Sequence, residues 1–348
     1  SANNTAGYNN PDVDKLLDEL AQTFDEDARK DLIIDIQQDI MDDAATVFFG
    51  YETTYLFSNK KVTGVKMYPM DYYWLTKDIT LVKERLFMLE IKDLSVQYGK
   101  QAPTIEHFNL SMKKGEIISV VGESGSGKTT VIRAVLGALA GGGRVSAGDI
   151  QFNGHSLLSN TKDEWRNLRG TRISMIFQDC GGTLNPIRKI GSQYVEYICT
   201  HTDVSKAEAW KKGCSMLQKM RLPDAENIMK SYPHQLSGGM RQRVGIAMAM
   251  TFNPELLLAD EPTSALDVTT QAQIVRQMME LRDDFGTGII IVTHNIGVAA
   301  YMADQLVVMQ HGKVVDQGTR DEVMNHPTSD YTKKLLAAVP EMEGQRYV

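Results

Sequence analysis

The sequence predicts an α/β protein with a mainly parallel β-sheet, an antiparallel β part and an inserted helical subdomain, preceded by a small α+β unit. From residue 88 onward, short β-branched runs such as "GEIISVVG", "LLLADEP" and "GIIIVTHN" alternate with helical patterns, which is typical of βαβ units. Before that point, two amphipathic helical patterns lead into aromatic-rich runs. This change in the sequence pattern predicts a boundary between two domains near residue 88.

Composition narrows the class of protein. The chain has 348 residues, of which 42% are hydrophobic, enough for two domains or one large one. The net charge of −7 argues against a nucleic-acid binder, which needs a basic surface to neutralise phosphates. The three cysteines have no CxxC spacing, so we expect reduced thiols in a cytosolic protein. No apolar run is long enough to span a membrane.

Residues 1–87 begin with two expected helices. Asn10 is placed to cap the first and Pro11 suits its first position. Apolar residues line one face of each helix, namely Val13, Leu16, Leu17 and Leu20, then Ala28, Leu32, Ile33, Ile36 and Ile40. A strand-like run, "ATVFFGYETTYLF", follows, and then "KVTGVKMYPMDYYWLTKDI".

The strongest local signal is "GESGSGKTT", which fits the phosphate-loop pattern between the strand "IISVV" and the helix "TTVIRAVLGAL". Backbone N–H groups of such a loop cradle phosphates, the Lys128 ammonium reaches the β- and γ-phosphates, and the Thr129 hydroxyl ligates Mg²⁺. The alternative is a glycine-rich turn that matches by chance. The predicted nucleotide-binding residues of this loop are Gly122, Ser124, Gly125, Ser126, Gly127, Lys128, Thr129 and Thr130.

Polar side chains follow three further apolar strands. The strand "LLLAD" ends at Asp260 and Glu261, which would hold Mg²⁺ and act as general base respectively, although paired acids at a strand end are commonly just solvated. "IIIVTHN" ends at His294, which would stabilise charge developing on the γ-phosphate. "ISMIFQD" carries Gln178, which would sense Mg²⁺ and the attacking water. The alternative for His294 is a structural role, which is more common for a lone histidine.

Two further features are less specific. Tyr98 ends the strand "LSVQY" and could stack on adenine, although a tyrosine here is more often core or surface. "LSGGMRQR", residues 236–243, precedes a buried helical run in a stretch, about 187–250, where we expect only helices. Glycines at a helix start either admit an anion to bare N–H groups or form a turn that caps a core helix.

The order of phosphate loop, Gln178, "LSGGMRQR", "LLLADE", "SALD" and "VTHN" resembles the ATP-binding cassette (ABC) ATPases, a branch of the P-loop NTPases. The resemblance covers about residues 88–348 and implies ATP as substrate with Mg²⁺ as cofactor. It implies that the signature binds ATP held by a second ATPase subunit and that the "SALD" segment crosses the dimer seam. The residues concerned are Ser237, Gly238, Gly239 and Asp267.

Within that family, "SALDVTTQAQIV", "TLNPIRKIGSQ" and the tail "HPTSDYTKKLLAAVP", part of residues 319–348, resemble ATPases of peptide and nickel importers. The implied partners are transmembrane permease subunits, a second ATPase in a homo- or heterodimer and, indirectly, an extracytoplasmic binding protein. The implied location is the cytoplasmic face of the cell membrane. The alternative is a non-transport ABC ATPase of translation or DNA repair; those carry two cassettes, or zinc-binding cysteines or long coiled coils, none of which we find.

Residues 1–87 resemble the C-terminal part of an extracytoplasmic peptide- or nickel-binding protein, on "YNNPDVDKLLDEL" and "KKVTGVKMYPMDYYWLTKDI". The fragment is too short to hold a complete ligand cleft, and Met88 is a plausible original start of the ATPase. We expect a gene fusion, an engineered chain or a truncated reading frame. The alternative is a cytosolic helical domain of a new kind.

Overall fold

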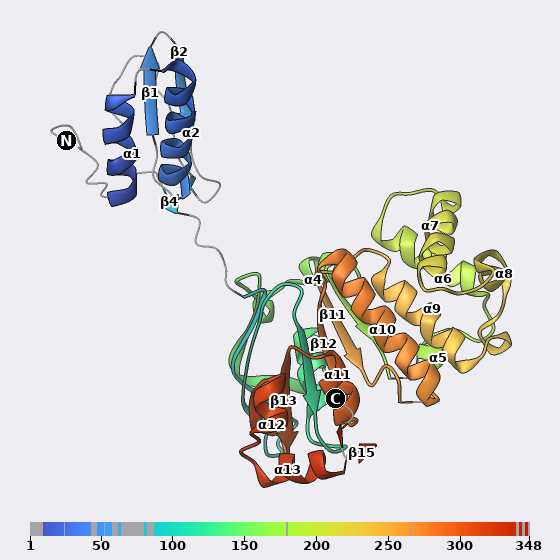
Figure 1. Cartoon of the computed structure of the whole chain (residues 1–348). Helices are drawn as coiled ribbons and strands as arrows, with labels where there is room; N and C mark the ends of the chain where they lie inside the picture. Colours follow the sequence, from blue (N-terminus) through green and yellow to red (C-terminus); the bar gives the residue numbers. More distant parts are fainter. Residues whose placement is uncertain are drawn as a thin grey trace. The chain divides into compact units, whose positions relative to one another are not determined.

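The computed structural model describes residues 10–23, 25–42, 47–51, 53–57, 62–63, 80–81, 87–178, 180–264, 266–338, 341–342 and 345–346. The chain divides into two compact units, Ser1–Arg85 and Leu86–Val348 (Figure 1). Among the described residues, no helix combines the length and apolar character needed to cross a bilayer.

The first unit contains two helices, α1 (Pro11–Gln22) and α2 (Glu26–Asp42). Asn10 caps α1 as expected, because its side chain accepts hydrogen bonds from the N–H groups of Asp12 and Val13. The Arg29 guanidinium on α2 donates to the carbonyls of Leu20 and Thr23, and so joins α2 to the end of α1.

The strand-like run after α2 forms a hairpin of two antiparallel strands, β1 (Val47–Tyr51) and β2 (Thr53–Phe57), where the sequence suggested one continuous run. Phe48 and Phe49 lie in β1. A shorter antiparallel pair follows, β3 (Val62–Thr63) with β4 (Thr80–Leu81). The aromatic residues between β3 and β4, which include Tyr72, Tyr73 and Trp74, lie outside the described residues.

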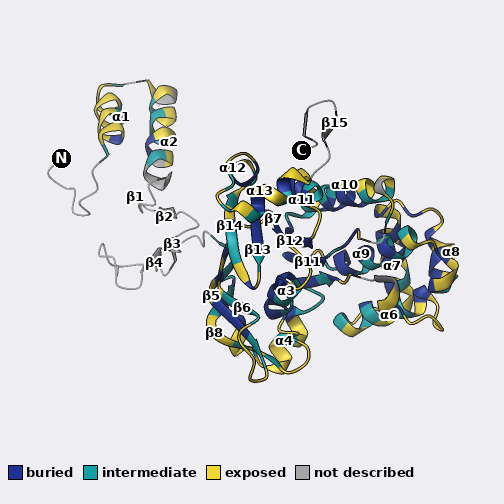
Figure 2. Cartoon of the chain, turned by 90° about the horizontal axis from the view of Figure 1, so that it is seen from below, coloured by how far each residue is buried: buried dark blue, intermediate teal, exposed yellow. Residues whose placement is uncertain are grey.

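The second unit is built on a six-stranded sheet in the order β10–β11–β12–β7–β13–β14. All neighbours are parallel except the edge strand β14, so the mainly parallel sheet is confirmed. Burial on both faces explains why its strands read as continuous apolar runs (Figure 2). The strands are β7 (Ile117–Val121), β10 (Ile173–Ile176), β11 (Leu256–Asp260), β12 (Gly288–Thr293), β13 (Gln305–Gln310) and β14 (Lys313–Thr319).

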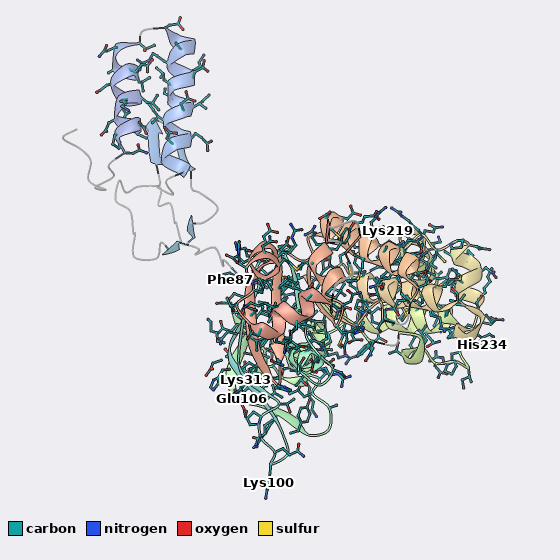
Figure 3. The ribbon with its side chains drawn as sticks, turned by 60° about the horizontal axis from the view of Figure 1, so that its bottom comes forward. Phe87, Lys100, Glu106, Lys219, His234 and Lys313 are labelled. Carbon is teal, nitrogen blue, oxygen red and sulfur yellow. The ribbon has the colours of Figure 1, made fainter. Side chains whose placement is uncertain are left out.

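The expected antiparallel part is a second sheet in the order β6–β5–β8–β9. Its strands are β5 (Leu89–Tyr98), β6 (Ile105–Met112), β8 (Gly143–Phe152) and β9 (His155–Ser156). An ion pair joins the two sheets, since Lys313 Nζ on β14 lies 3.0 Å from Glu106 Oε2 on β6 (Figure 3).

In the second unit, helices also occur outside the segment between β10 and β11. They are α3 (Lys128–Val135), α4 (Lys162–Leu168), α10 (Val268–Phe285), α11 (Ile296–Met302), α12 (Arg320–Asn325) and α13 (Asp330–Ala337). The helix after the phosphate loop is shorter than expected, because α3 stops before Gly137, whose φ of 63° lies in the left-handed region. The chain closes with two short strands, β15 (Glu341–Met342) and β16 (Gln345–Arg346).

Among the described residues between β10 and β11 there are helices and turns but no strand; the α-helices are α5 (Cys180–Thr183), α6 (Ile190–His201), α7 (Lys206–Lys219), α8 (Ala225–Lys230) and α9 (Gly238–Met250). α9 includes both glycines of the signature in its first turn, although glycine is a poor helix former, because Ser237 caps the helix directly before them. The buried Tyr194 hydroxyl on α6 pairs with the Thr251 hydroxyl at 2.8 Å, which fixes α6 against the end of α9.

We predict that the second unit folds without the first. Among the described residues, its apolar clusters contain only residues from Met88 onward. A chain that starts at Met88 should therefore show its main thermal transition within about 2 °C of the full chain by circular dichroism. A transition more than about 5 °C lower, or an insoluble product, would show that residues 1–87 form part of its folded core.

Candidate functional site

The phosphate loop joins β7 to α3 and depends on glycines at two points. A Cβ on Gly122 would lie 2.2 Å from the Met309 carbonyl oxygen, and its φ is 154°, so only glycine fits. Gly127, with φ of 100°, turns the chain into α3. Ser124 and Gly125 are exposed at the tip of the loop, whereas Ser126 is buried. The loop thus presents an open backbone tip on a fixed base.

Lys128 points back into this loop. Its Nζ donates to the carbonyls of Gly122 at 2.7 Å and Glu123 at 2.6 Å, and the side chain is buried. Burial lowers the pKa of Lys128, and the carboxylates of Glu261, Asp260 and Glu123 oppose that shift. The loop therefore holds a cation at its centre, where phosphate oxygens could meet it.

Asp260 ends β11 and faces the first turn of α3. The Thr129 hydroxyl donates to its Oδ1 at 2.8 Å, while Thr130 next to it is half-buried. Burial raises the pKa of Asp260, and the hydrogen bond from Thr129 and the charge of Arg133 oppose that shift. A hydroxyl and a carboxylate side by side offer the hard oxygen ligands that suit Mg²⁺ beside bound phosphates, so these two residues fit that cofactor.

Glu261, Gln178 and His294 meet at the carboxyl ends of three adjacent strands. His294 Nδ1 lies 3.1 Å from Glu261 Oε1, and Gln178 Nε2 donates to Glu261 Oε2 at 3.4 Å. Glu261 has a left-handed φ of 44°, held by its N–H, which donates to the Val292 carbonyl at 2.8 Å. This strained residue aims a carboxylate between an amide and an imidazole.

Ser237, Gly239 and Asp267 form a second group, on α9 and α10. Ser237 accepts from the Met240 N–H, and Asp267 caps α10 by accepting from the Thr270 N–H at 2.9 Å. That N–H bond lowers the pKa of Asp267. The starts of α9 and α10 lie close together. A Cβ on Gly239 would lie only 2.9 Å from the Thr270 methyl group. A Cβ on Gly238 would meet no atom within 4 Å, so this helix start faces open space.

Tyr98 ends β5 in the antiparallel sheet. It pairs with Gly143 on β8, and a Cβ on Gly143 would lie 2.5 Å from the Tyr98 ring. The half-buried ring therefore covers Gly143, and no described contact links it to the phosphate loop.

The sequence analysis did not identify Gln242. Its buried side chain donates from Nε2 to the carbonyl of Pro262 at 2.5 Å, and so links the signature helix α9 to the residue after Glu261. A buried amide must find a hydrogen-bond partner, but the sequence of α9, in which Arg241 and Arg243 flank Gln242, does not mark this amide as buried.

A groove of about 540 Å³ separates the main sheet from the helical subdomain. Its walls come from β10 and from α6 and α9, and Phe177, which precedes Gln178, is 43% exposed at this groove. Residues lining the groove include Thr183, Arg188, Tyr197 and Met248.

Known proteins share both the sequence and the fold. The family described as "ABC transporter" matches residues 105–264. The chain is 42% identical over 261 residues to the oligopeptide transport ATP-binding protein OppD of Salmonella typhimurium, across 74% of this chain and 78% of that protein. It is 41% identical to the dipeptide transport ATP-binding protein DppD of Lactococcus lactis, across 74% of this chain and 75% of that protein.

Two solved structures resemble the fold. The structure of cbiO1 from Clostridium perfringens, part of the ABC transporter complex cbiONQ, superposes with a TM-score of 0.60 at 26% identity, covering 70% of this chain and 92% of that one. The dimeric post-hydrolysis structure of the ATP-binding cassette MJ0796, bound to ADP and Pi, gives a TM-score of 0.59 at 27% identity, covering 67% and 99%.

We predict that Gly122→Ala destabilises the chain by about 1–3 kcal/mol, because the new methyl group would collide with a backbone oxygen that cannot move away cheaply. Urea unfolding of the full chain measures the change. Gly238→Ala is the matched control, since its methyl group enters open space in a helix and should be neutral or slightly stabilising. Equal unfolding midpoints for the two variants would contradict the prediction.

Proposed function

This chain belongs to the family of ABC transporter ATP-binding proteins, and we propose that it hydrolyses ATP to power the import of peptides across the cytoplasmic membrane. The observation that carries the proposal is the cluster of Gln178, Glu261 and His294 beside a phosphate loop. The cargo follows from the relatives, which are named as oligopeptide and dipeptide transport proteins. Nickel or another metal chelate is the cargo that the sequence leaves open beside peptides.

Lys128 and the loop backbone bind the phosphates. When ATP enters, its β- and γ-phosphate oxygens meet the Lys128 ammonium, which the carbonyls of Gly122 and Glu123 hold in place. The N–H groups at the start of α3 add a partial positive charge toward the same oxygens. Tyr98 is the residue proposed to stack on adenine, because its ring is only half-buried.

Glu261 is the proposed general base. Its carboxylate takes a proton from a water that attacks the γ-phosphorus, and ADP departs as the phosphate–oxygen bond breaks. His294 stabilises the charge that develops on the γ-phosphate, and Gln178 orients the water. Thr129, Asp260 and Gln178 would hold Mg²⁺. That ion, when bound, neutralises charge on the phosphate oxygens.

A second ATPase subunit completes the site. We propose that Ser237, Gly238 and Gly239 bind the γ-phosphate of ATP held by the partner, because the start of α9 faces open space and its N–H groups suit an anion. Asp267 would lie at the same seam, since Thr270 brings the starts of α9 and α10 together. ATP then holds two subunits head to tail, in a homo- or heterodimer, and hydrolysis lets them part.

The groove between the main sheet and α6 is the proposed docking site for a transmembrane permease subunit. It lies directly beside Gln178, so a movement of the permease can reach the hydrolytic residues through Phe177. Docking there places the chain at the cytoplasmic face of the membrane, where an extracytoplasmic binding protein acts on it only through the permease. We propose, from their sequence pattern, that residues 1–87 derive from such a binding protein.

We predict that Lys128→Ala lowers the rate of ATP hydrolysis by at least about a hundredfold, because the loop loses the charge that stabilises the transferred phosphate. A phosphate-release assay on the full chain measures the rate. In cells that lack the gene, uptake of a labelled oligopeptide should return with the wild type and not with Lys128→Ala. Wild-type turnover by the folded variant would contradict the catalytic role, and unchanged peptide uptake in the deleted cells would contradict the cargo.

We predict that Glu261→Gln binds ATP and Mg²⁺ but accumulates as an ATP-bound dimer, alone or with a sister ATPase. The amide keeps the size of the side chain but cannot accept the proton. Light scattering with and without ATP measures the mass. Glu280→Gln, on an exposed ion pair with Arg221, is the matched control and should neither dimerise more nor lose activity. Normal hydrolysis by Glu261→Gln would show that another group is the base.

A further inference from the structure

The C-terminal helix α13 reaches the phosphate loop through one hydrogen bond. The N–H of Glu123, the second residue of the loop, donates to the Tyr331 hydroxyl at 2.9 Å, across a sequence separation of 208 residues. Burial raises the pKa of Tyr331, and its hydroxyl oxygen accepts this bond. The nucleotide chemistry described above makes no use of this contact.

This N–H belongs to the same peptide group as the Gly122 carbonyl, and that carbonyl accepts a hydrogen bond from Lys128 Nζ at 2.7 Å. The peptide between Gly122 and Glu123 is therefore held at both ends, by a phenol on its nitrogen and by an ammonium on its oxygen. A rotation of this peptide would turn the oxygen away from Lys128, because the peptide group is rigid and planar.

Tyr331 can hold the peptide because α13 is itself fixed. The Asp316 carboxylate on β14 accepts from the N–H groups of Thr328 and Ser329, directly before the helix. Leu336 on α13 is 2% exposed and belongs to the same apolar cluster as Val121, the residue before Gly122. The helix is thus anchored to the strand that leads into the loop.

We propose that Tyr331 is a positioning residue for the phosphate loop, which fixes the Gly122–Glu123 peptide and, through it, the ammonium of Lys128. The inference deepens the proposed function and rests on it in one respect, that the loop binds ATP. A role only in packing α13 would require the ring and not the hydroxyl. Tyr331→Phe separates these two roles, because it removes the hydroxyl and keeps the ring.

The first test is kinetic and uses the full chain. Tyr331→Phe should raise the ATP KM about threefold to tenfold, the size expected for one lost hydrogen bond, with kcat within about twofold and the thermal midpoint unchanged. Tyr301→Phe, on the neighbouring helix α11 where the ring is 50% exposed, is the matched control and should leave KM unchanged. An ATP KM for Tyr331→Phe equal to that of the control would overturn the proposal.

The second test needs no nucleotide and so separates this inference from the proposed function. Hydrogen exchange of the peptide covering residues 122–128 should be faster in Tyr331→Phe than in wild type, because the Glu123 N–H loses its acceptor. Unchanged exchange there would overturn the proposal even if ATP hydrolysis were normal. Faster exchange in a chain that fails to hydrolyse ATP would support Tyr331 and contradict the proposed function.

A double-mutant cycle tests the route through Lys128. If Tyr331 acts by placing the ammonium, the change from tyrosine to phenylalanine should have little effect on ATP affinity, less than about twofold, in a Lys128→Ala background. A fluorescent ATP analogue measures the affinity of all four proteins. Full additivity of the two substitutions would overturn the route and with it the positioning role.

Discussion

The buried ammonium group of Lys128 is the constraint around which the second unit is arranged. A charge removed from water needs close oxygen partners, and here two carbonyls of the loop supply them. The loop can turn those carbonyls inward only because Gly122 has no side chain to meet Met309. The carboxylates of Asp260 and Glu261 offset part of the remaining cost, and they lie close because β11 is separated from β7 by a single parallel strand.

Local patterns were sufficient to predict the fold class. The phosphate loop lies between a buried strand and a helix, and the chain-order of the motifs led to the ABC ATPase fold, which the solved structures share. Gln178, Glu261 and His294 could be assigned to one edge because the carboxyl ends of parallel strands share an edge. The distances between these three side chains could not be predicted, because they depend on the left-handed backbone conformation of Glu261.

Contacts between distant parts of the chain were not predictable from sequence. Nothing around Gln242 indicates that its amide will bind the Pro262 carbonyl, and nothing around Tyr331 indicates the phosphate loop. The same limit applies to the first unit. Its helical pattern identified Val13 and Ile36, which are 2% and 3% exposed, but Leu17 belongs to the same stripe and is 46% exposed. An apolar face in a helical pattern shows that the face can be buried. It does not show which of its residues are buried.

The left-handed backbone of Glu261 has a consequence for how this protein can change over time. A glutamate in that conformation costs of the order of 1 kcal/mol that glycine would not incur. Selection for stability alone would therefore favour loss of the carboxylate, so the strained residue would persist only while the chemistry proposed for it is needed. A copy released from that need could exchange Glu261 for glycine and become a more stable, inactive protein with the same fold.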